Sequence, residues 1–245
     1  MNNVSKSIGW ANFTINPVRG LCPVDCKDNQ GKSYCYARKM YKRFKWNPEI
    51  RFEGPVNISA ELLRIRKPSR IFVGSTMELF GEWVDAHWMD VILEATKVHS
   101  QHTFLFLTKC PQNLKRFSPF PANCLVGVSV TNPEQFKQAH LELIRISATV
   151  KFLSFEPLLE QIITPDPRWP LTTYLGECAS WIICGQQTPM SASTSPRIEW
   201  VREIVEAADK ASIPVFLKNN LHEFLYADDI FWANERATLR QEMPG

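Results

Sequence analysis

The 245-residue sequence contains no apolar run of the ~18 residues that a membrane-spanning helix needs. Its first residues, MNNVSKSIGWANF, lack the basic and then apolar pattern of a signal peptide. We therefore expect a cytoplasmic protein with no membrane partner. Its net charge of +3 is too small to indicate a nucleic-acid-binding protein on its own. Internal repeats and low-complexity tracts are also absent, which leaves an ordinary globular protein.

A disulfide framework is excluded on two grounds. The seven cysteines are an odd number, and the cytoplasm keeps thiols reduced. The ordinary interpretation of a cytoplasmic cysteine is a small buried apolar residue. We expect that role for four of them: Cys110, Cys124, Cys178 and Cys184.

What the sequence does contain is a series of short, nearly continuous apolar runs with helix-like stretches between several of them. This pattern is typical of parallel strands with helices on one side and a core on the other, and it predicts an α/β fold. The runs are Arg70–Gly74, Thr103–Thr108, Leu125–Val130, Val150–Phe155, Trp181–Gly185 and Ile213–Lys218.

A further strand near residues 7–15 would bring the number to about seven. An apolar stripe of Trp200, Val201, Ile204, Val205, Ala208 and Ala211 predicts a helix that begins at Ser195–Pro196, the N-cap and first helical residue.

The periodicity does not separate an open doubly wound sheet from a barrel. In both, the functional site lies at the carboxyl ends of the strands. Polar residues follow all six runs there: Ser75-Thr76, Thr108-Lys109, Ser129 with Thr131-Asn132, Glu156, Gln186-Gln187 and Lys218-Asn219-Asn220.

Three cysteines need a different explanation from burial. Cys22, Cys26 and Cys35 lie close together in a loop rich in Pro, Gly, Asp and Asn. A structural zinc site takes four ligands, whereas no histidine or cysteine follows in the sequence until His87. Three thiolates with an open position favour a 4Fe–4S cluster. Zinc with a distant fourth ligand and unligated thiols remain the alternatives.

The segments CPVDC (22–26) and YCYA (34–37) resemble the radical S-adenosylmethionine signature, in which three cysteines hold the cluster and an aromatic residue precedes the third. The first spacing matches this signature, and Tyr34 occupies the aromatic position. The second spacing has eight residues instead of the usual two, as though about six had been inserted within KDNQGKS.

The chain as a whole is similar to the phage Gp37/Gp68-like family (DUF5131). The resemblance rests on six segments in family order: INPVRGLC (15–22), STMELF (75–80), FLTKCPQNL (106–114), GVSVTN (127–132), LSFEPLL (153–159) and VFLKN (215–219). It implies a radical SAM-type partial (β/α)6 barrel with mostly parallel strands. It implies one domain over 1–245, with a core of about 8–220 and a C-terminal extension of about 221–245. The tail from about Tyr226 is a candidate cap for the open side of the barrel.

The resemblance also implies the chemistry. The cofactors would be a 4Fe–4S cluster and S-adenosyl-L-methionine, which reductive cleavage converts to methionine and a 5′-deoxyadenosyl radical that abstracts hydrogen from substrate. An electron donor such as a flavodoxin or ferredoxin would be a partner. The cluster ligands would be Cys22, Cys26 and Cys35. Cofactor contacts are expected from Tyr34, Ser75, Thr76, Ser129, Asn132, Glu156 and Gly185; the alternative for Glu156 is an ion pair with Lys109 or Lys218.

A basic stretch, YARKMYKRFKW, follows the third cysteine. Helical spacing would place Tyr36, Met40 and Phe44 toward the core and the cations Arg38, Lys39, Lys42 and Arg43 on another face. Those cations are candidate contacts to DNA or RNA phosphates, and Tyr41 and Trp46 are candidates for stacking on bases. A solvated helix face is the alternative. The other functional readings are a zinc-stabilised nucleic-acid-binding module without catalysis and a barrel that has lost its chemistry.

Overall fold

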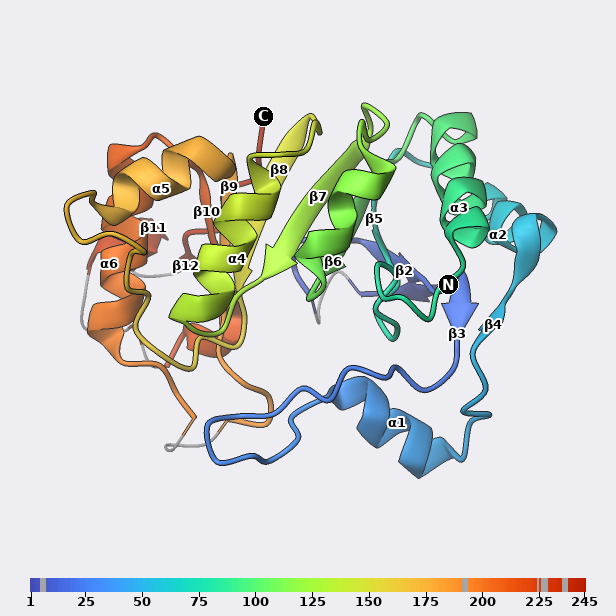
Figure 1. The fold of residues 1–245 in the computed structure, drawn as a ribbon, viewed down its shortest axis with the longest axis horizontal. Coiled ribbons are helices and arrows are strands. Elements are labelled where there is room, and N and C mark those ends of the chain that lie inside the picture. The colour runs from blue at the N-terminus through green and yellow to red at the C-terminus, as the bar shows by residue number, and fades with distance from the viewer. Residues whose placement is uncertain (5–7, 191–193, 224, 226–228, 235–237) are drawn as a thin grey trace. The chain divides into compact units, whose positions relative to one another are not determined.

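The computed structural model describes the chain except for residues 5–7, 191–193, 224, 226–228 and 235–237 (Figure 1). It is a mixed α/β structure whose main sheet is mostly parallel and has eight strands in the order β1-β2-β5-β6-β7-β8-β9-β10. Their bounds are β1 (Asn2–Asn3), β2 (Phe13–Ile15), β5 (Arg70–Val73), β6 (Thr103–Thr108), β7 (Cys124–Ser129), β8 (Val150–Phe155), β9 (Trp181–Cys184) and β10 (Val215–Leu217). Small antiparallel sheets pair β3 (Val18–Arg19) with β4 (Arg51–Phe52), and β11 (Trp232–Asn234) with β12 (Thr238–Leu239).

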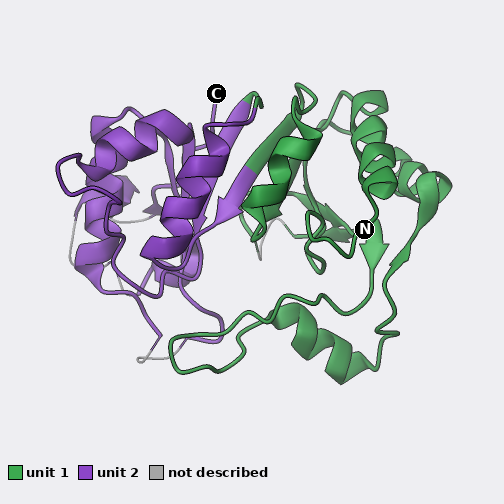
Figure 2. Cartoon of the chain, viewed as in Figure 1, with its two compact units in different colours: residues 1–126, 147–149 green, residues 127–146, 150–245 purple. Residues whose placement is uncertain are grey.

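The chain divides into two compact units, and the division falls inside β7 (Figure 2). Unit 1 consists of Met1–Val126 and Ser147–Thr149. Unit 2 consists of Gly127–Ile146 and Val150–Gly245.

In unit 1, strands β2, β5 and β6 pair in parallel, and β1 pairs antiparallel with β2. Ile71, Phe104 and Phe106 are fully buried in its core. Because the three parallel strands end at the same edge, the residues that follow Ile15, Val73 and Thr108 are brought together there. Unit 1 also contains α1 (Tyr36–Phe44), α2 (Gly54–Leu63), α3 (Ala86–Val98) and the 3-10 helix η1 (Pro111–Phe117), and α2 packs against α3 (Figure 1).

In unit 2, strands β8, β9 and β10 pair in parallel. Helix α5 (Leu171–Cys178) packs against both α4 (Pro133–Leu143) and α6 (Ile198–Lys210), and two short 3-10 helices, η2 (Asn219–Leu221) and η3 (Asp229–Phe231), follow β10. The C-terminal tail runs antiparallel beside β10, since Leu217 N donates to Arg240 O at 2.7 Å and Glu242 N donates to Val215 O at 3.0 Å. Its start, near Tyr226, lies outside the described residues. The tail therefore covers the outer edge of β10.

All six apolar runs form strands, which confirms the α/β class. The strands from β2 to β10 follow one another in chain order, so the sheet lacks the reversal that defines a doubly wound sheet. The N-terminal strand is shorter than predicted: β2 begins at Phe13, and Ser7 lies outside the described residues. The predicted start of α6 at Ser195–Pro196 is wrong. The helix begins at Ile198 after Arg197, because the Ser195 hydroxyl donates to Gln186 Oε1 at 2.8 Å instead of capping the helix.

Among the described residues, no helix has the length and apolar character that crossing a membrane requires.

Candidate metal centre

The cysteine loop of unit 1 contains a small closed hairpin that accounts for its unusual spacing. Lys27 and Ser33 form an antiparallel bridge, and Tyr34 N donates to Cys26 O at 3.0 Å. At the tip, buried Asp28 accepts from the backbone N–H groups of Gln30 and Lys32 at 3.0 and 2.9 Å, and Gly31 adopts a φ of 76°. The extra residues therefore fold out as a hairpin and return the chain beside Cys26.

The three thiols interact in this arrangement. The Cys26 thiol donates a hydrogen bond to the Cys35 sulfur, and Cys22 interacts electrostatically with both. All three side chains are half-buried. Burial raises the pKa of Cys22, while backbone N–H groups of Glu78 and Val24 that point at its sulfur oppose that shift. Such N–H donors stabilise a thiolate and therefore suit a metal ligand.

Cys35 is also the N-cap of α1, where its sulfur accepts from Arg38 N at 3.5 Å. The hydrogen bond from Cys26, together with the N–H groups of Arg38 and Ala37, lowers the pKa of Cys35 to about 6. The same bond raises the pKa of Cys26, which remains the proton donor. Cys35 is therefore the thiolate of the pair at neutral pH.

In the metal-free protein, we expect iodoacetamide to modify Cys35 first at pH 7. Because its pKa lies below its ordinary value of 9.0, the thiolate is already formed at pH 7 and is lost as the pH falls through about 6. The labelling rate should fall about tenfold between pH 7 and pH 5. Peptide mass spectrometry at short times measures it, with Cys35→Ser as the control. Equal labelling of Cys22 and Cys35 at pH 7 would contradict this arrangement.

Helix α1 holds the cysteine loop through its polar side chains. Arg38 Nη2 donates to the carbonyls of Cys22 and Val24 at 3.0 and 3.3 Å, and Gly20 N donates to the Tyr41 hydroxyl at 2.7 Å. The Tyr36 hydroxyl donates to the carbonyl of Ser75, which follows β5. The helix is thus tied both to the loop and to the strand ends.

Two expectations for this helix are wrong. Its buried side chains are Ala37 and Tyr41, whereas Tyr36 and Phe44 are 50% and 52% exposed. Tyr41, only 8% exposed and bonded to Gly20, is not available for stacking on a base. The physical reason is that hydrogen bonds to the loop, and not the apolar pattern, set the orientation of this nine-residue helix.

The ends of β2 and β5 meet at this site, as the sequence predicted for parallel strands. Asn16 Oδ1 accepts from Thr76 N and Thr76 Oγ1, both at 3.0 Å, and from Ser75 Oγ at 3.3 Å. Gly74, with a φ of 81°, makes the turn between strand and site. The predicted cofactor residues Ser75 and Thr76 are therefore fixed by Asn16.

Glu78 is a site residue that the sequence reasoning did not select. Its side chain is only 7% exposed. Oε1 accepts from Thr108 Oγ1 at 2.6 Å and from Phe80 N at 3.0 Å, and Oε2 accepts from Lys109 N at 2.7 Å. Its own backbone N–H points at the Cys22 sulfur. Glu78 therefore connects the end of β6 to the cysteine loop.

The segment after β6 brings a cation and a fourth thiol to the same place. Lys109 interacts electrostatically with Cys26, Cys35 and Cys110. Cys110 is half-buried, whereas Cys124, Cys178 and Cys184 are buried as expected. Burial and the Glu78 carboxylate raise the pKa of Cys110 to about 12, and Cys22 acts on it as well. The expectation that Cys110 is a buried core residue is wrong, because it follows the end of β6 and is only half-buried.

Among the described residues, no three His, Cys, Asp or Glu side chains form a group that could hold a metal ion.

The other predicted cofactor residues lie in unit 2. Glu156 forms an ion pair with Lys218, the alternative interpretation for this residue, and both are half-buried. A Cβ at Gly185 would lie 3.0 Å from the Lys218 side chain and 3.2 Å from the Glu156 side chain, so a larger residue at this position would crowd the ion pair. Asn132 is the N-cap of α4, where its Oδ1 accepts from Gln135 N at 2.9 Å. Ser129 ends β7 and is buried.

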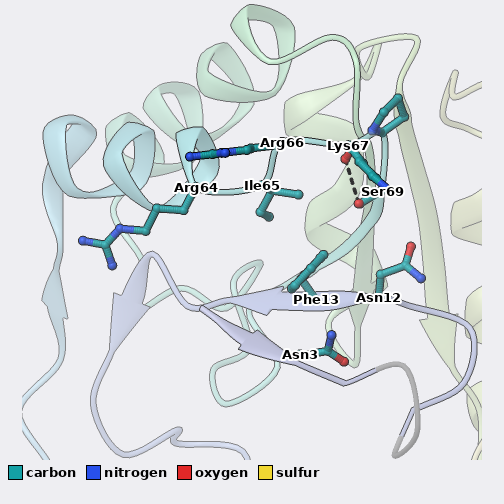
Figure 3. A pocket seen from close by; sticks show the side chains of 9 residues that line it. Asn3, Asn12, Phe13, Arg64, Ile65, Arg66, Lys67 and Ser69 are labelled. Atoms are coloured by element: carbon teal, nitrogen blue, oxygen red, sulfur yellow. Dashed lines mark hydrogen bonds between the residues drawn. The ribbon is translucent and has the colours of Figure 1, made fainter.

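A pocket of about 460 Å³ lies elsewhere in unit 1 (Figure 3). Its lining includes Phe13, which begins β2, and Ser69, which precedes β5 and donates to Lys67 O at 2.8 Å. It therefore lies at the amino ends of the strands, opposite the cysteine loop. Arg64, Arg66 and Lys67 make it basic, but none of the cysteines lines it.

Residues 5–228 match the sequence model of a family described as "Protein of unknown function (DUF5131)". The chain belongs to this family. The DUF5131 match includes the cysteine loop, Glu78, Cys110 and the unit 2 residues up to Lys218. No curated protein and no solved structure matches the chain.

Proposed function

We propose that this DUF5131 protein is a radical S-adenosylmethionine enzyme whose Cys22, Cys26 and Cys35 hold a 4Fe–4S cluster. The observation that carries the proposal is the hairpin at residues 27–33, which returns the chain so that Tyr34 N donates to Cys26 O and Cys35 follows directly, despite the long spacing. The loop lies at the carboxyl ends of parallel strands, where the sites of β/α folds are built. The sequential strand order also supports a partial (β/α)6 barrel.

The donor set suits a cluster better than zinc. A structural zinc site takes four protein ligands, whereas the loop supplies three cysteines. A four-iron cluster is wider than one ion and takes its thiolates from around its edge. Half-exposed thiols with N–H donors at the sulfurs of Cys22 and Cys35, and a nearby lysine, provide the hydrogen bonds and positive charge that stabilise thiolate ligands.

When bound, the cluster and cofactor would supply the one-electron chemistry that makes the adenosyl radical. The chain's own contribution is positioning. Arg38 and Tyr41 fix the cysteine loop, and Asn16 fixes Thr76 at the end of β5. Lys109 adds positive charge beside the thiolates. The cofactor contacts of Tyr34, Ser75, Thr76, Ser129, Asn132, Glu156 and Gly185 remain part of this proposal.

The proposal is tested by anaerobic purification with assays of iron, acid-labile sulfide and absorbance near ~400 nm. Dithionite and S-adenosylmethionine are then added, and 5′-deoxyadenosine is measured by chromatography. About four irons per chain and production of 5′-deoxyadenosine support the proposal. Zinc would point to the binding module without catalysis, and iron without cofactor cleavage to a barrel that has lost its activity. Either result would overturn the proposed function.

We further propose that the substrate is a single-stranded nucleic acid that binds along α1. Lys39, Lys42 and Arg43 are exposed, and the helix contains no acidic residue. Beside them Phe44 and Trp46 stack with centroids 5.5 Å apart and are 52% and 43% exposed. Cations next to exposed aromatic rings provide phosphate contacts and base stacking together. Arg38 is excluded from this surface, because it bonds to the cysteine loop.

Replacing Lys39, Lys42 and Arg43 with alanine should weaken binding of a single-stranded oligonucleotide by about 10- to 100-fold. Each lost phosphate contact should lower the slope of log K against log salt by about 0.7. Fluorescence anisotropy over a salt series measures both. The matched control replaces Arg64, Arg66 and Lys67, three exposed cations of the Figure 3 pocket, with alanine. Equal losses in the two variants would show only a general charge effect and would refute a surface on α1.

A further inference from the structure

The basic pocket at the amino ends of the strands has no part in the proposed function. All of its lining belongs to unit 1. The loop of residues 64–69, which joins α2 to β5, lies on one side of it, and β1 and β2 lie on the other, with Phe13 pointing from β2 toward the loop (Figure 3). Its volume of about 460 Å³ is within the range of ~300–1,000 Å³ that small-molecule sites occupy. The pocket therefore has room for one small ligand.

The loop gives the pocket positive charge that no acid balances. Arg64, Arg66 and Lys67 are exposed, and none of them forms an ion pair with a residue that the structure describes. The acid nearest to them in the sequence, Glu61, already pairs with the amino group of Met1 at 3.1 Å. Neighbouring cations repel one another, and an anion that binds between them relieves this repulsion. These three side chains, which we call the loop cations, therefore favour an anionic group such as phosphate.

Hydrogen bonds hold the loop that carries these charges. Ile65 is only 5% exposed, and its N–H donates to Leu62 O at 2.9 Å. Ser69 Oγ donates to Lys67 O at 2.8 Å, and Ser69 O accepts from Thr103 N at 3.0 Å. Because the backbone of the loop is already fixed at both ends, a ligand does not have to order it on binding.

The side of the pocket formed by β2 offers an aromatic ring and an amide. Phe13 is half-buried and has no ring contact with the other described aromatic side chains. Beside it, Asn12 Oδ1 accepts from Arg70 N and Asn12 N donates to Arg70 O, both at 2.8 Å. These bonds fix Asn12 and leave its NH2 group without a partner among the residues described. A ring beside an NH2 donor suits a nucleobase, which stacks through its face and accepts hydrogen bonds at its edge.

We propose that this pocket binds a nucleotide, with the phosphate against the loop cations and the base on Phe13. The Asn12 NH2 group then donates to a carbonyl oxygen or ring nitrogen of the base. Phosphate alone would account for the charges but not for the ring and the amide. The inference goes beyond the proposed function and does not depend on it, because the pocket contains none of the cysteines and no part of α1.

The experiment is isothermal titration calorimetry of the purified protein at low salt, where charge contacts are least screened. The ligand is uridine monophosphate, whose base differs from the adenine of S-adenosylmethionine, and uridine and inorganic phosphate are titrated separately. The nucleotide should bind about tenfold or more tightly than either of the two, because both sets of contacts then act in one molecule. Equal affinities for the nucleotide and for inorganic phosphate would overturn the nucleotide assignment, and so would the absence of binding.

Two variants separate the contacts. Replacing the three loop cations with alanine should weaken the nucleotide and inorganic phosphate by about tenfold or more. Phe13→Leu should weaken the nucleotide by about fivefold or more but leave inorganic phosphate unchanged, which also shows that this variant is folded. The matched control replaces Lys39, Lys42 and Arg43 of α1 with alanine, removes the same charge and should bind the nucleotide as the wild type does. Equal losses in the two charge variants would overturn the inference.

A further variant separates this inference from the proposed function. Replacing Cys22, Cys26 and Cys35 with alanine should leave the affinity for uridine monophosphate unchanged, because these residues do not line the pocket. Weaker binding in this variant would place the nucleotide at the metal centre and overturn the inference. A wild type that holds zinc and binds the nucleotide in the pocket would support the inference while the radical mechanism fails.

Discussion

Simultaneous replacement of Cys22, Cys26 and Cys35 with alanine should lower the iron content from about four atoms per chain to almost none. The three sulfurs are the proposed cluster ligands, and Cys110 alone cannot hold a cluster. Absorbance near ~400 nm and cofactor cleavage should disappear with the iron. The measurement is iron and sulfide per chain after anaerobic reconstitution of variant and wild type together.

The variant should remain folded, because the three thiols are half-buried in a loop and not in the core. The free energy of unfolding of the metal-free variant, measured in urea, should therefore fall by no more than the ~0.5–2 kcal/mol that loss of the Cys35 cap of α1 costs. Cys124→Ser is the matched control for loss of a thiol that is not a ligand, and it should reconstitute like the wild type. Iron retained in the triple variant would show that these cysteines are not the ligands.

The strands could be predicted from the sequence because they are buried on both faces. Phe104, Leu105 and Phe106 in β6 are all fully buried, so the run is continuously apolar and easy to recognise. The orientation of α1 could not be predicted in the same way. Its apolar residues lie on more than one side of the helix, and the bond between Gly20 N and the Tyr41 hydroxyl holds the side of Ala37 and Tyr41 inside.

Only part of the candidate site could be predicted from the sequence. Spacing identified the loop cysteines, but Cys110 is separated from them by 75 residues and reaches the site only through pairing of β5 with β6. The sequence around Glu78 did contain an indication of its role. It is an acid between Met77 and Leu79, with Phe80 next, and all three neighbours are buried. A carboxylate in such a segment must find hydrogen-bond donors inside the protein, and this requirement marks it as a structural or functional group.

Glu78→Gln should destabilise the protein by about 1–3 kcal/mol. The carboxylate accepts on both oxygens: Oε1 from Thr108 and Phe80, and Oε2 from Lys109 N. An amide has only one acceptor oxygen. In one orientation its NH2 group meets the N–H of Lys109, and in the other it meets that of Phe80. Either way a buried donor faces another donor, and neither side can reach water.

Urea unfolding of the metal-free protein measures this cost, with Glu82→Gln as the control. Glu82 is exposed and four residues away, so its change in stability should stay within ~0.5 kcal/mol. Glu78→Gln should also weaken metal retention, since the same carboxylate holds the backbone that carries Lys109 and Cys110. If the two variants were equally stable, the Glu78 bonds would contribute nothing. If Glu78→Gln lost stability but retained iron as the wild type does, Glu78 would support the fold of unit 1 without organising the thiols.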